Sequence, residues 1–360
     1  MNIKFFLLVL TFCFSGAYAE DITLKDGDVV ALVGNTFIER DAEYSYIETA
    51  LTLANLDKDV IFRNYGWSGD SVKGESRGYF NPDGYKDLLK GVAESKPTVI
   101  LLAYGANAAW NGQAGLAQFK KDYNKLIDDL GKSTKARFIL VSPIKQENLG
   151  APYPDPTQHN KDLGLYSAVV GEIASARKFP FIDLYSKFKS SKDLTTNSIH
   201  LAPAGYRKVA QVIGEAFGLK FPVSEGVVDL EGELVTISGS KVTGIKASTS
   251  GVEFTVTGKA FTFPGIADTA ADSLKVKGLV AGSYTLLING EKVAEASAKQ
   301  WQSGVNYSGF QGEVLRKAIV AKNELFFHAW RPQNTTYLFL FRKHEQGRNA
   351  KDIPAIYKHL

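Results

Sequence analysis

The first 220 residues alternate between short apolar runs and longer segments with helical periodicity, and this alternation limits the possible folds more than any other feature. The apolar runs predict strands at 29–33, 60–62, 99–103, 138–141 and 179–184. The segments between them predict helices at 37–56, 82–94, 116–131, 163–177 and 203–217. Strands that alternate with helices form a parallel sheet covered on both faces. We therefore expect an α/β domain over residues 20–220.

The pattern changes near residues 221–222, where strand-like runs become separated by turn residues. These runs span 227–237, 241–247, 252–257 and 283–288, with turns at Ser238-Gly239, Ser250-Gly251 and Asn289-Gly290. An Asn-Gly pair between two such runs is typical of a β-hairpin. We therefore expect a smaller, antiparallel, β-rich domain over residues 221–296, followed by a helix and strand tail over 297–360.

Residues 1–19 have the three parts of a secretory signal peptide. A basic start precedes an apolar core at 5–14, and Ala17-Tyr18-Ala19 forms a small-residue cleavage site. The only cysteine, Cys13, lies inside this segment. The sequence therefore predicts a chain exported to the periplasm or the exterior, with neither a disulfide nor a thiol nucleophile after cleavage.

Charge and composition favour some partner classes over others. The net charge is +4, from 42 Lys and Arg against 38 Asp and Glu, and the two signs are well mixed along the chain. This distribution does not resemble that of a nucleic-acid-binding protein. The five histidines are scattered without the spacing of metal ligands. We expect no nucleic-acid partner, no metal and, after signal cleavage, no membrane contact; the sequence indicates no oligomeric state.

Four loops of the predicted α/β domain carry residue types that can build a ligand site. Three follow predicted strands and one precedes the last predicted helix, and ligands of open α/β sheets bind at the carboxyl ends of strands. In chain order the loops hold Asn35 with Thr36, Gly69, Asn107, and Asn197 with His200. Each also has a simpler interpretation: Thr36 as a helix cap, Gly69 as a turn glycine, Asn107 as a loop brace and His200 as a buried histidine bonded to backbone.

Taken together, the loops resemble the four motifs of the SGNH (GDSL-type) hydrolases, and the resemblance covers about residues 27–218. That family reads Gly-Asp-Ser, Asn-x-Gly-x-x-Gly, Gly-x-Asn-Asp and Asp-x-x-His. This chain reads Gly34-Asn35-Thr36, Asn64-Tyr65-Gly66-Trp67-Ser68-Gly69, Gly105-Ala106-Asn107-Ala108 and Asn197-Ser198-Ile199-His200. The resemblance implies a three-layer, flavodoxin-like fold and acyl transfer without a cofactor. It implies Thr36 as nucleophile and His200 as base, with Gly69 and Asn107 in the oxyanion hole.

Two departures from the family fall on the catalytic triad. Thr36 replaces the serine nucleophile, and its extra methyl group restricts χ1. Asn197 replaces the aspartate, and an amide cannot stabilise an imidazolium by charge. Candidates for a displaced acid are Asp193, Asp183 and Glu147. The Gly-Asn-Thr motif and the tail also resemble a branch of large secreted bacterial SGNH-like proteins.

The tail admits two interpretations. Its predicted helix at 313–322 is followed by an aromatic, strand-like segment at 326–342, interrupted at 331–334. In the first interpretation this segment is a solvated strand edge with a packed aromatic face. In the second it folds over the catalytic face, where Glu345 or His344 completes the site.

Two functions follow from these observations. The first is an exported hydrolase acting on a small ester or an acylated carbohydrate. The second is a catalytically impaired protein of the same fold that binds glycan, with Trp67, Trp110 or Trp330 as stacking surfaces. A scaffold role centred on the β-rich domain ranks behind both. An acid in contact with the His200 ring would favour the first function, and a ring with only amide or backbone partners would favour the second.

Overall fold

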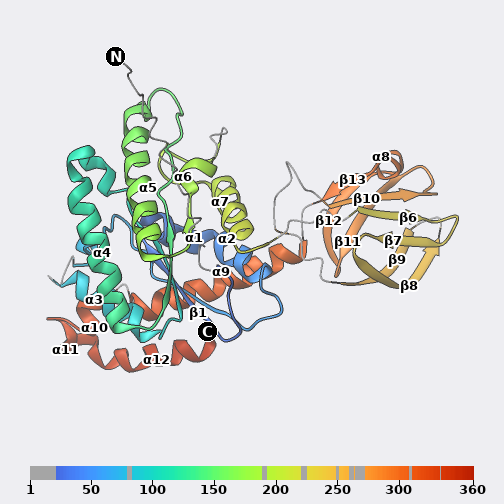
Figure 1. Ribbon diagram of the computed structural model, residues 1–360. Coiled ribbons are helices and arrows are strands. Elements are labelled where there is room, and N and C mark those ends of the chain that lie inside the picture. Colours follow the sequence, from blue (N-terminus) through green and yellow to red (C-terminus); the bar gives the residue numbers. More distant parts are fainter. Residues whose placement is uncertain are drawn as a thin grey trace, which may run out of the picture.

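A computed structural model describes residues 22–78, 83–188, 193–219, 225–248, 251–258, 263, 272–307, 310–332 and 334–360. The predicted signal peptide at 1–19 and the expected helix start at Asn81-Pro82 lie outside these residues. The chain forms an α/β domain with a β-rich region set to one side of it (Figure 1).

Five parallel strands form the sheet of the α/β domain, in the order β2-β1-β3-β4-β5. They are β1 (Val29–Gly34), β2 (Ile61–Asn64), β3 (Val99–Ala103), β4 (Arg137–Val141) and β5 (Phe181–Ile182). β1 lies inside the sheet and pairs with β2 on one side and β3 on the other. This is the order of a flavodoxin-like sheet, and it confirms the predicted fold class.

Side chains alternate between two buried faces of this sheet. In β1, Val30 and Leu32 enter one core cluster, while Ala31 and Val33 enter the other. Helices α2 and α7 supply the first cluster, and α3, α4 and α5 supply the second. Because both faces of the sheet are buried, the sequences of its strands are continuous apolar runs and do not alternate between apolar and polar residues.

The helices correspond broadly to the predicted segments. Those of the α/β domain are α1 (Thr36–Tyr44), α2 (Tyr46–Leu53), α3 (Gly84–Glu94), α4 (Leu116–Ser133), α5 (Thr157–Arg177), α6 (Leu184–Lys187) and α7 (Pro203–Ala216). The single helix expected at 37–56 is wrong, because Ser45 adopts a left-handed conformation with φ 54° and separates α1 from α2. Within the described residues, no helix has the length and apolar character needed to cross a bilayer.

The β-rich region contains one sheet of four strands and two separate hairpins. The sheet order is β13-β10-β6-β7, and the hairpins are β8–β9 and β11–β12. The strands are β6 (Glu225–Asp229), β7 (Leu234–Ile237), β8 (Ser240–Ser248), β9 (Gly251–Gly258), β10 (Asp272–Lys277), β11 (Ser283–Ile288), β12 (Glu291–Ser297) and β13 (Val305–Tyr307). Helix α8 (Ala298–Ser303) lies between β12 and β13.

Two expectations for this region need correction. The single strand expected at 227–237 is two strands, because Asp229 Oδ1 accepts hydrogen bonds from the N–H groups of Glu231 and Gly232 and turns the chain. The region is also not purely antiparallel, since β6 and β10 pair in parallel. The hairpin predicted from Asn289-Gly290 is confirmed, with both residues at positive φ between β11 and β12.

The strand expected at 326–342 is wrong, because this part of the tail is largely helical. Helix α9 (Phe310–Trp330) extends well beyond the predicted 313–322, and α10 (Thr335–Leu338), α11 (Lys343–Gln346) and α12 (Ile353–Ile356) follow. Phe326 and Trp330, one helical turn apart, both pack against Tyr65 next to β2. Aromatic residues favour strands on average, but here the packing of Phe326 and Trp330 against the α/β domain stabilises a helix.

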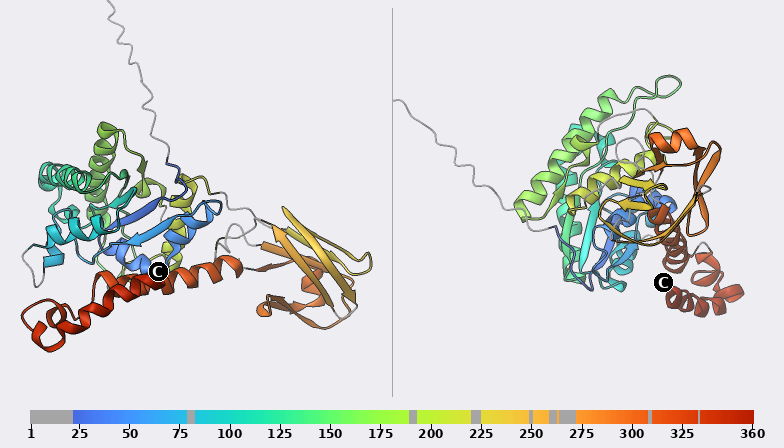
Figure 2. Two further views of the ribbon diagram at one scale, coloured as in Figure 1. Left: turned by 90° about the horizontal axis from the view of Figure 1, so that it is seen from below. Right: turned by 90° about the vertical axis from the view of Figure 1, so that its right-hand side faces the viewer.

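Polar contacts also fasten α9 to the α/β domain. Lys322 Nζ donates to a carboxylate oxygen of Glu48 at 2.6 Å and to the carbonyl of Phe62 at 3.2 Å. Asn323 Nδ2 donates to Ser45 Oγ at 3.0 Å and to Glu48 at 2.9 Å. Figure 2 shows α9 running along this side of the α/β domain. The helix therefore covers the edge strand β2 and the break between α1 and α2.

The closest backbone approach relevant to the site lies between Gly66 and α1. A Cβ on Gly66 would lie 2.1 Å from Glu39 N and 2.5 Å from its Cα. We expect Gly66→Ala to lower the free energy of unfolding by about 3 kcal/mol or more, because both contacts are with backbone. Urea denaturation would measure the change. Gly91→Ala is the matched control: its Cβ would meet nothing closer than 3.8 Å in α3, so it should stabilise by about 0.5–1 kcal/mol. Equal effects of the two changes would contradict the steric argument.

Candidate active site

A cavity of about 230 Å³ opens at the carboxyl edge of the sheet, near β1 and β3. Strand order reverses between these two strands, and open α/β sheets place their ligand sites at such a point. Thr36, Asn107 and His200 all line this cavity, together with Asn35. Gly69 and Asn197 do not line it. Gly69 contacts Thr36, and Asn197 contacts His200. The structure thus gathers the residues of all four sequence motifs at one place.

The Thr36 hydroxyl points toward the loop that follows β2. Thr36 Oγ1 accepts a hydrogen bond from the backbone N–H of Gly69 at 2.9 Å. Asn35, and not Thr36, caps α1, since Asn35 Oδ1 accepts from the N–H of Phe37 at 3.1 Å. The interpretation of Thr36 as a helix cap is therefore wrong, and its hydroxyl stands beside a backbone donor of the kind that forms an oxyanion hole.

Asn64 holds the second loop against α1. Its Nδ2 donates to the carbonyl of Ile38 at 2.7 Å, and its Oδ1 accepts from the N–H of Gly66 at 2.9 Å. Gly69 has a φ of +73°, which a residue with a side chain rarely adopts. These contacts set the direction of the Gly69 N–H.

A buried ion pair supports the same loop from behind, and sequence reasoning missed it. Arg77 Nε donates to Asp70 Oδ2 at 2.6 Å, and the Tyr104 hydroxyl donates to the same oxygen at 2.9 Å. Burial raises the pKa of the Asp70 carboxyl, against the lowering by Arg77. The Asp70 carbonyl accepts from Asn107 Nδ2 at 3.0 Å, so this cluster also positions the second expected oxyanion donor. The seven-residue separation of Asp70 and Arg77 gave no recognisable signal in the sequence.

The His200 ring contacts the side-chain amide of Asn197. Asn197 Nδ2 lies 3.0 Å from His200 Nδ1, while Asn197 Oδ1 accepts from the backbone N–H groups of His200 at 2.8 Å and Ile199 at 3.3 Å. Both backbone groups can only donate, so they assign the amide oxygen to their side and direct the NH₂ group at the ring. His200 Nδ1 must then accept, which leaves the proton of the neutral ring on Nε2.

This tautomer is opposite to the one that a hydrolase of this type needs. A catalytic base holds its proton on Nδ1 and accepts the nucleophile's proton at Nε2. Burial, and secondly the charge of Arg40, lower the pKa of His200, so the ring is neutral at neutral pH. An aspartate at 197 could accept both the backbone N–H and an Nδ1–H. The Asn197 amide accepts from the backbone N–H, but it presents its NH₂ group to the ring and so cannot accept from an Nδ1–H.

The three candidate acids have other contacts. The Glu147 carboxylate is buried and accepts from the N–H and hydroxyl of Thr195 at 2.8 and 2.6 Å, so it braces the loop that carries Asn197. Asp183 caps α6, and Asp193 is exposed at a positive φ. Among the described residues, no carboxylate contributes to the pKa of His200. The structure therefore does not bring a displaced acid to the ring.

Two aromatic rings stand at the cavity. Trp110 stacks on His159 with ring centroids 3.6 Å apart, and 65% of its surface stays exposed. Both line the cavity, and His159 is a further site residue that sequence reasoning did not single out. Trp67 and Trp330, the other suggested stacking surfaces, do not line it and pack against each other instead.

The expected role of the tail in the site is also not found. Neither His344 nor Glu345 lines the cavity, and Glu345 pairs with Arg342 at 2.5 Å. Near the site, the described part of the tail contacts the second loop, where the Arg331 guanidinium lies 3.5 Å from the ring centroid of Trp67. Within the described ranges, no group of three or more His, Cys, Asp or Glu side chains is placed to hold a metal ion.

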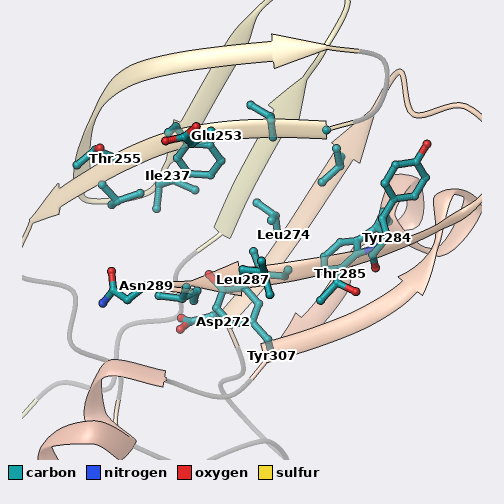
Figure 3. A pocket seen from close by; sticks show the side chains of 18 of the residues that line it. Ile237, Glu253, Thr255, Asp272, Leu274, Tyr284, Thr285, Leu287, Asn289 and Tyr307 are labelled. Carbon is teal, nitrogen blue, oxygen red and sulfur yellow. The ribbon is translucent and has the colours of Figure 1, made fainter. Parts of the chain in front are cut away.

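A larger cavity, of about 940 Å³, lies in the β-rich region and is separate from this site (Figure 3). Side chains from β9, β10 and β11 line it, among them Leu274, Tyr284 and Leu287. Several of these residues belong to the apolar cluster that joins the four-stranded sheet to the two hairpins. The cavity is thus continuous with the small core of this region.

Comparison with known proteins places the α/β domain in a family. Residues 33–208 match the model of the GDSL-like lipase/acylhydrolase family. A gut microbial diltiazem-metabolizing enzyme superposes with a TM-score of 0.59 over 95% of this chain and 88% of its own, at 16% identity, which shows a common fold.

Two further solved structures match about half of the chain. An acetylxylan esterase from Geobacillus stearothermophilus matches over 55% of this chain and 98% of its own, at 18% identity and a TM-score of 0.43. A lipase/acylhydrolase from Enterococcus faecalis matches over 54% and 97%, at 22% identity and a TM-score of 0.39. No curated protein matches the chain by sequence.

The contact with Asn197 predicts the position of a proton that nitrogen-15 NMR can observe. Above neutral pH, we expect His200 Nε2 to carry the proton and Nδ1 to be unprotonated, and Asn197→Asp to reverse the two. His200→Gln would assign the signals. Arg40→Gln should raise the pKa of His200, because it removes a positive charge that disfavours the imidazolium. A parent protein with its proton on Nδ1 would contradict the assignment of the amide.

Proposed function

Because residues 33–208 form a GDSL-like lipase/acylhydrolase domain, we propose that the protein binds an ester in the cavity near β1 and β3 and hydrolyses it slowly at Thr36. The observation that carries this proposal is the 2.9 Å contact between Thr36 Oγ1 and the Gly69 N–H. It sets a hydroxyl beside a backbone donor, in a cavity that His200 and Asn107 also line.

In the proposed reaction, Thr36 Oγ1 attacks the ester carbonyl carbon and its proton passes to His200. The carbonyl oxygen becomes an oxyanion, which the Gly69 N–H and an N–H of Asn107 Nδ2 stabilise. One such donor contributes about 3–4 kcal/mol to lowering the barrier. The alcohol leaves with the proton from His200, and water then hydrolyses the acyl-threonine by the same path in reverse. This chemistry requires no cofactor.

Asn197 limits the proposed rate. His200 must present an unprotonated Nε2 to the Thr36 hydroxyl, and the amide favours the opposite tautomer. The equivalent change from aspartate to asparagine lowers kcat by about 10⁴ in a serine protease. The methyl group of Thr36 also restricts the rotation of its hydroxyl. We therefore propose slow turnover.

The same contact favours a second candidate function, in which the domain binds a ligand without hydrolysing it. A His200 ring whose described partner is an amide is the arrangement expected of such a protein. In either case, we propose an acylated carbohydrate as the ligand, because the exposed face of Trp110 stands at the cavity. We also propose export, on the basis of the sequence of residues 1–19.

A gain-of-function variant separates the two candidates. We expect Asn197→Asp to raise kcat for 4-nitrophenyl acetate by up to about 10⁴-fold, because a carboxylate can accept the Nδ1 proton and restore the basic Nε2. Thr36→Ser should give a further increase by removing the methyl group. Hydrolysis rates of the purified mature chain and its variants would measure both effects.

The controls show whether the gain arises at the proposed site. Asn148→Asp adds the same charge at an exposed loop residue and should leave the rate unchanged. Thr36→Ala or His200→Ala, placed in the Asn197→Asp background, should abolish the gain. If Asn197→Asp moves the proton to Nδ1 but does not raise the rate, hydrolysis at Thr36 is refuted and the binding function remains.

A further inference from the structure

The charged groups of the active-site cavity are all of one sign. The described residues that line it include one arginine, Arg40, and one lysine, Lys145, and none is Asp or Glu. Arg40 lies on α1, four residues after Thr36, and Lys145 lies in the loop after β4. Two separate elements thus contribute a basic residue to the wall of the same cavity, although acidic and basic residues are nearly equal in number in the whole chain.

Neither cation forms an ion pair within the described parts of the chain. Lys145 Nζ lies 4.5 Å from the ring centroid of Tyr185, and Arg40 is half-buried at the cavity wall. Two cations of the tail that pack against α1 and α2 are paired: Arg331 with Glu39 at 2.5 Å, and Lys322 with Glu48 at 2.6 Å. Since partly buried cations are normally compensated, the two at the cavity are free to bind an anion.

The positive charge reaches the reacting groups. Arg40 is the second cause, after burial, of the lowered pKa of His200. Burial likewise lowers the pKa of His159, against a raising by the charge of Asp162, which lies outside the cavity lining. Among the described lining residues, the charged groups are therefore those of Arg40 and Lys145, and a concave site with low-dielectric walls concentrates such a field on its ligand.

We propose that the ligand is the ester of an acidic sugar, with its carboxylate bound by Arg40 and Lys145 and its ring against Trp110. The ester part of this proposal rests on the proposed function above. A guanidinium binds a carboxylate through two parallel hydrogen bonds, and an ammonium adds a point charge. The exposed face of Trp110 offers an apolar surface in the same cavity. A neutral sugar would leave both cations unpaired.

A matched pair of sugars tests the carboxylate without relying on hydrolysis. Methyl glucuronoside and methyl glucoside differ only in a carboxylate against a hydroxymethyl group, and neither carries an ester. Calorimetry or NMR titration of the mature chain should give about tenfold or greater preference for the glucuronoside. Arg40→Gln and Lys145→Gln should each remove most of this preference, and added salt should reduce it.

The control is Lys90→Gln, which removes one positive charge from an exposed position on α3 and should keep the preference. Circular dichroism would show that each variant is folded. Equal affinity for the two sugars, or a preference that survives both cavity variants, would overturn the proposal.

Parallel assays separate this proposal from the proposed hydrolysis. If 4-nitrophenyl acetate is hydrolysed at Thr36 but the glucuronoside has no advantage, the hydrolase stands and the acidic ligand is refuted. If the glucuronoside binds through Arg40 and Lys145 but no variant hydrolyses the aryl ester, the anion site stands and the hydrolysis is refuted.

Discussion

The close approach of the loop after β2 to helix α1 is the constraint on which the site depends. Gly66 lies so near the backbone of Glu39 that no side chain fits between them, and Asn64 ties the two segments together through Ile38. This contact brings the Gly69 N–H to the Thr36 hydroxyl. The buried pair of Asp70 and Arg77 then holds the loop from the other side. The proposed oxyanion donors, the Gly69 N–H and the Asn107 side chain, are therefore positioned by contacts within the protein itself.

Asn197 has the opposite effect on the other half of the site. Its carbonyl oxygen holds the backbone of His200, as an aspartate oxygen would, so the loop keeps its shape. Its NH₂ group, however, gives the ring a donor where the reaction needs an acceptor. One side chain thus preserves geometry while changing the position of a proton. A site of this kind can match a family in structure and still differ from it in rate by orders of magnitude.

Much of this arrangement could be predicted from the sequence because it depends on local patterns. Apolar runs predicted the strands, and the four motifs predicted which loops meet at the edge of the sheet. The break at Ser45 and the helical state of Phe326 and Trp330 could not be predicted, because distant packing decides both. The ion pair of Asp70 and Arg77 could not be predicted for a related reason. The path of the loop between the two residues decides whether they meet, and the sequence does not specify this path.

Helix α9 has a consequence for the way the chain is divided. It comes last of the long helices, yet it covers β2 and donates from Lys322 to the carbonyl of Phe62. The β-rich region at 225–307 is therefore an insertion within the α/β unit, attached to it at both ends. Expression of residues 22–219 alone would remove this cover and leave an open sheet edge, the kind of surface through which strands of separate molecules pair and aggregate. Helix α9 thus protects the edge strand β2 from pairing with another molecule.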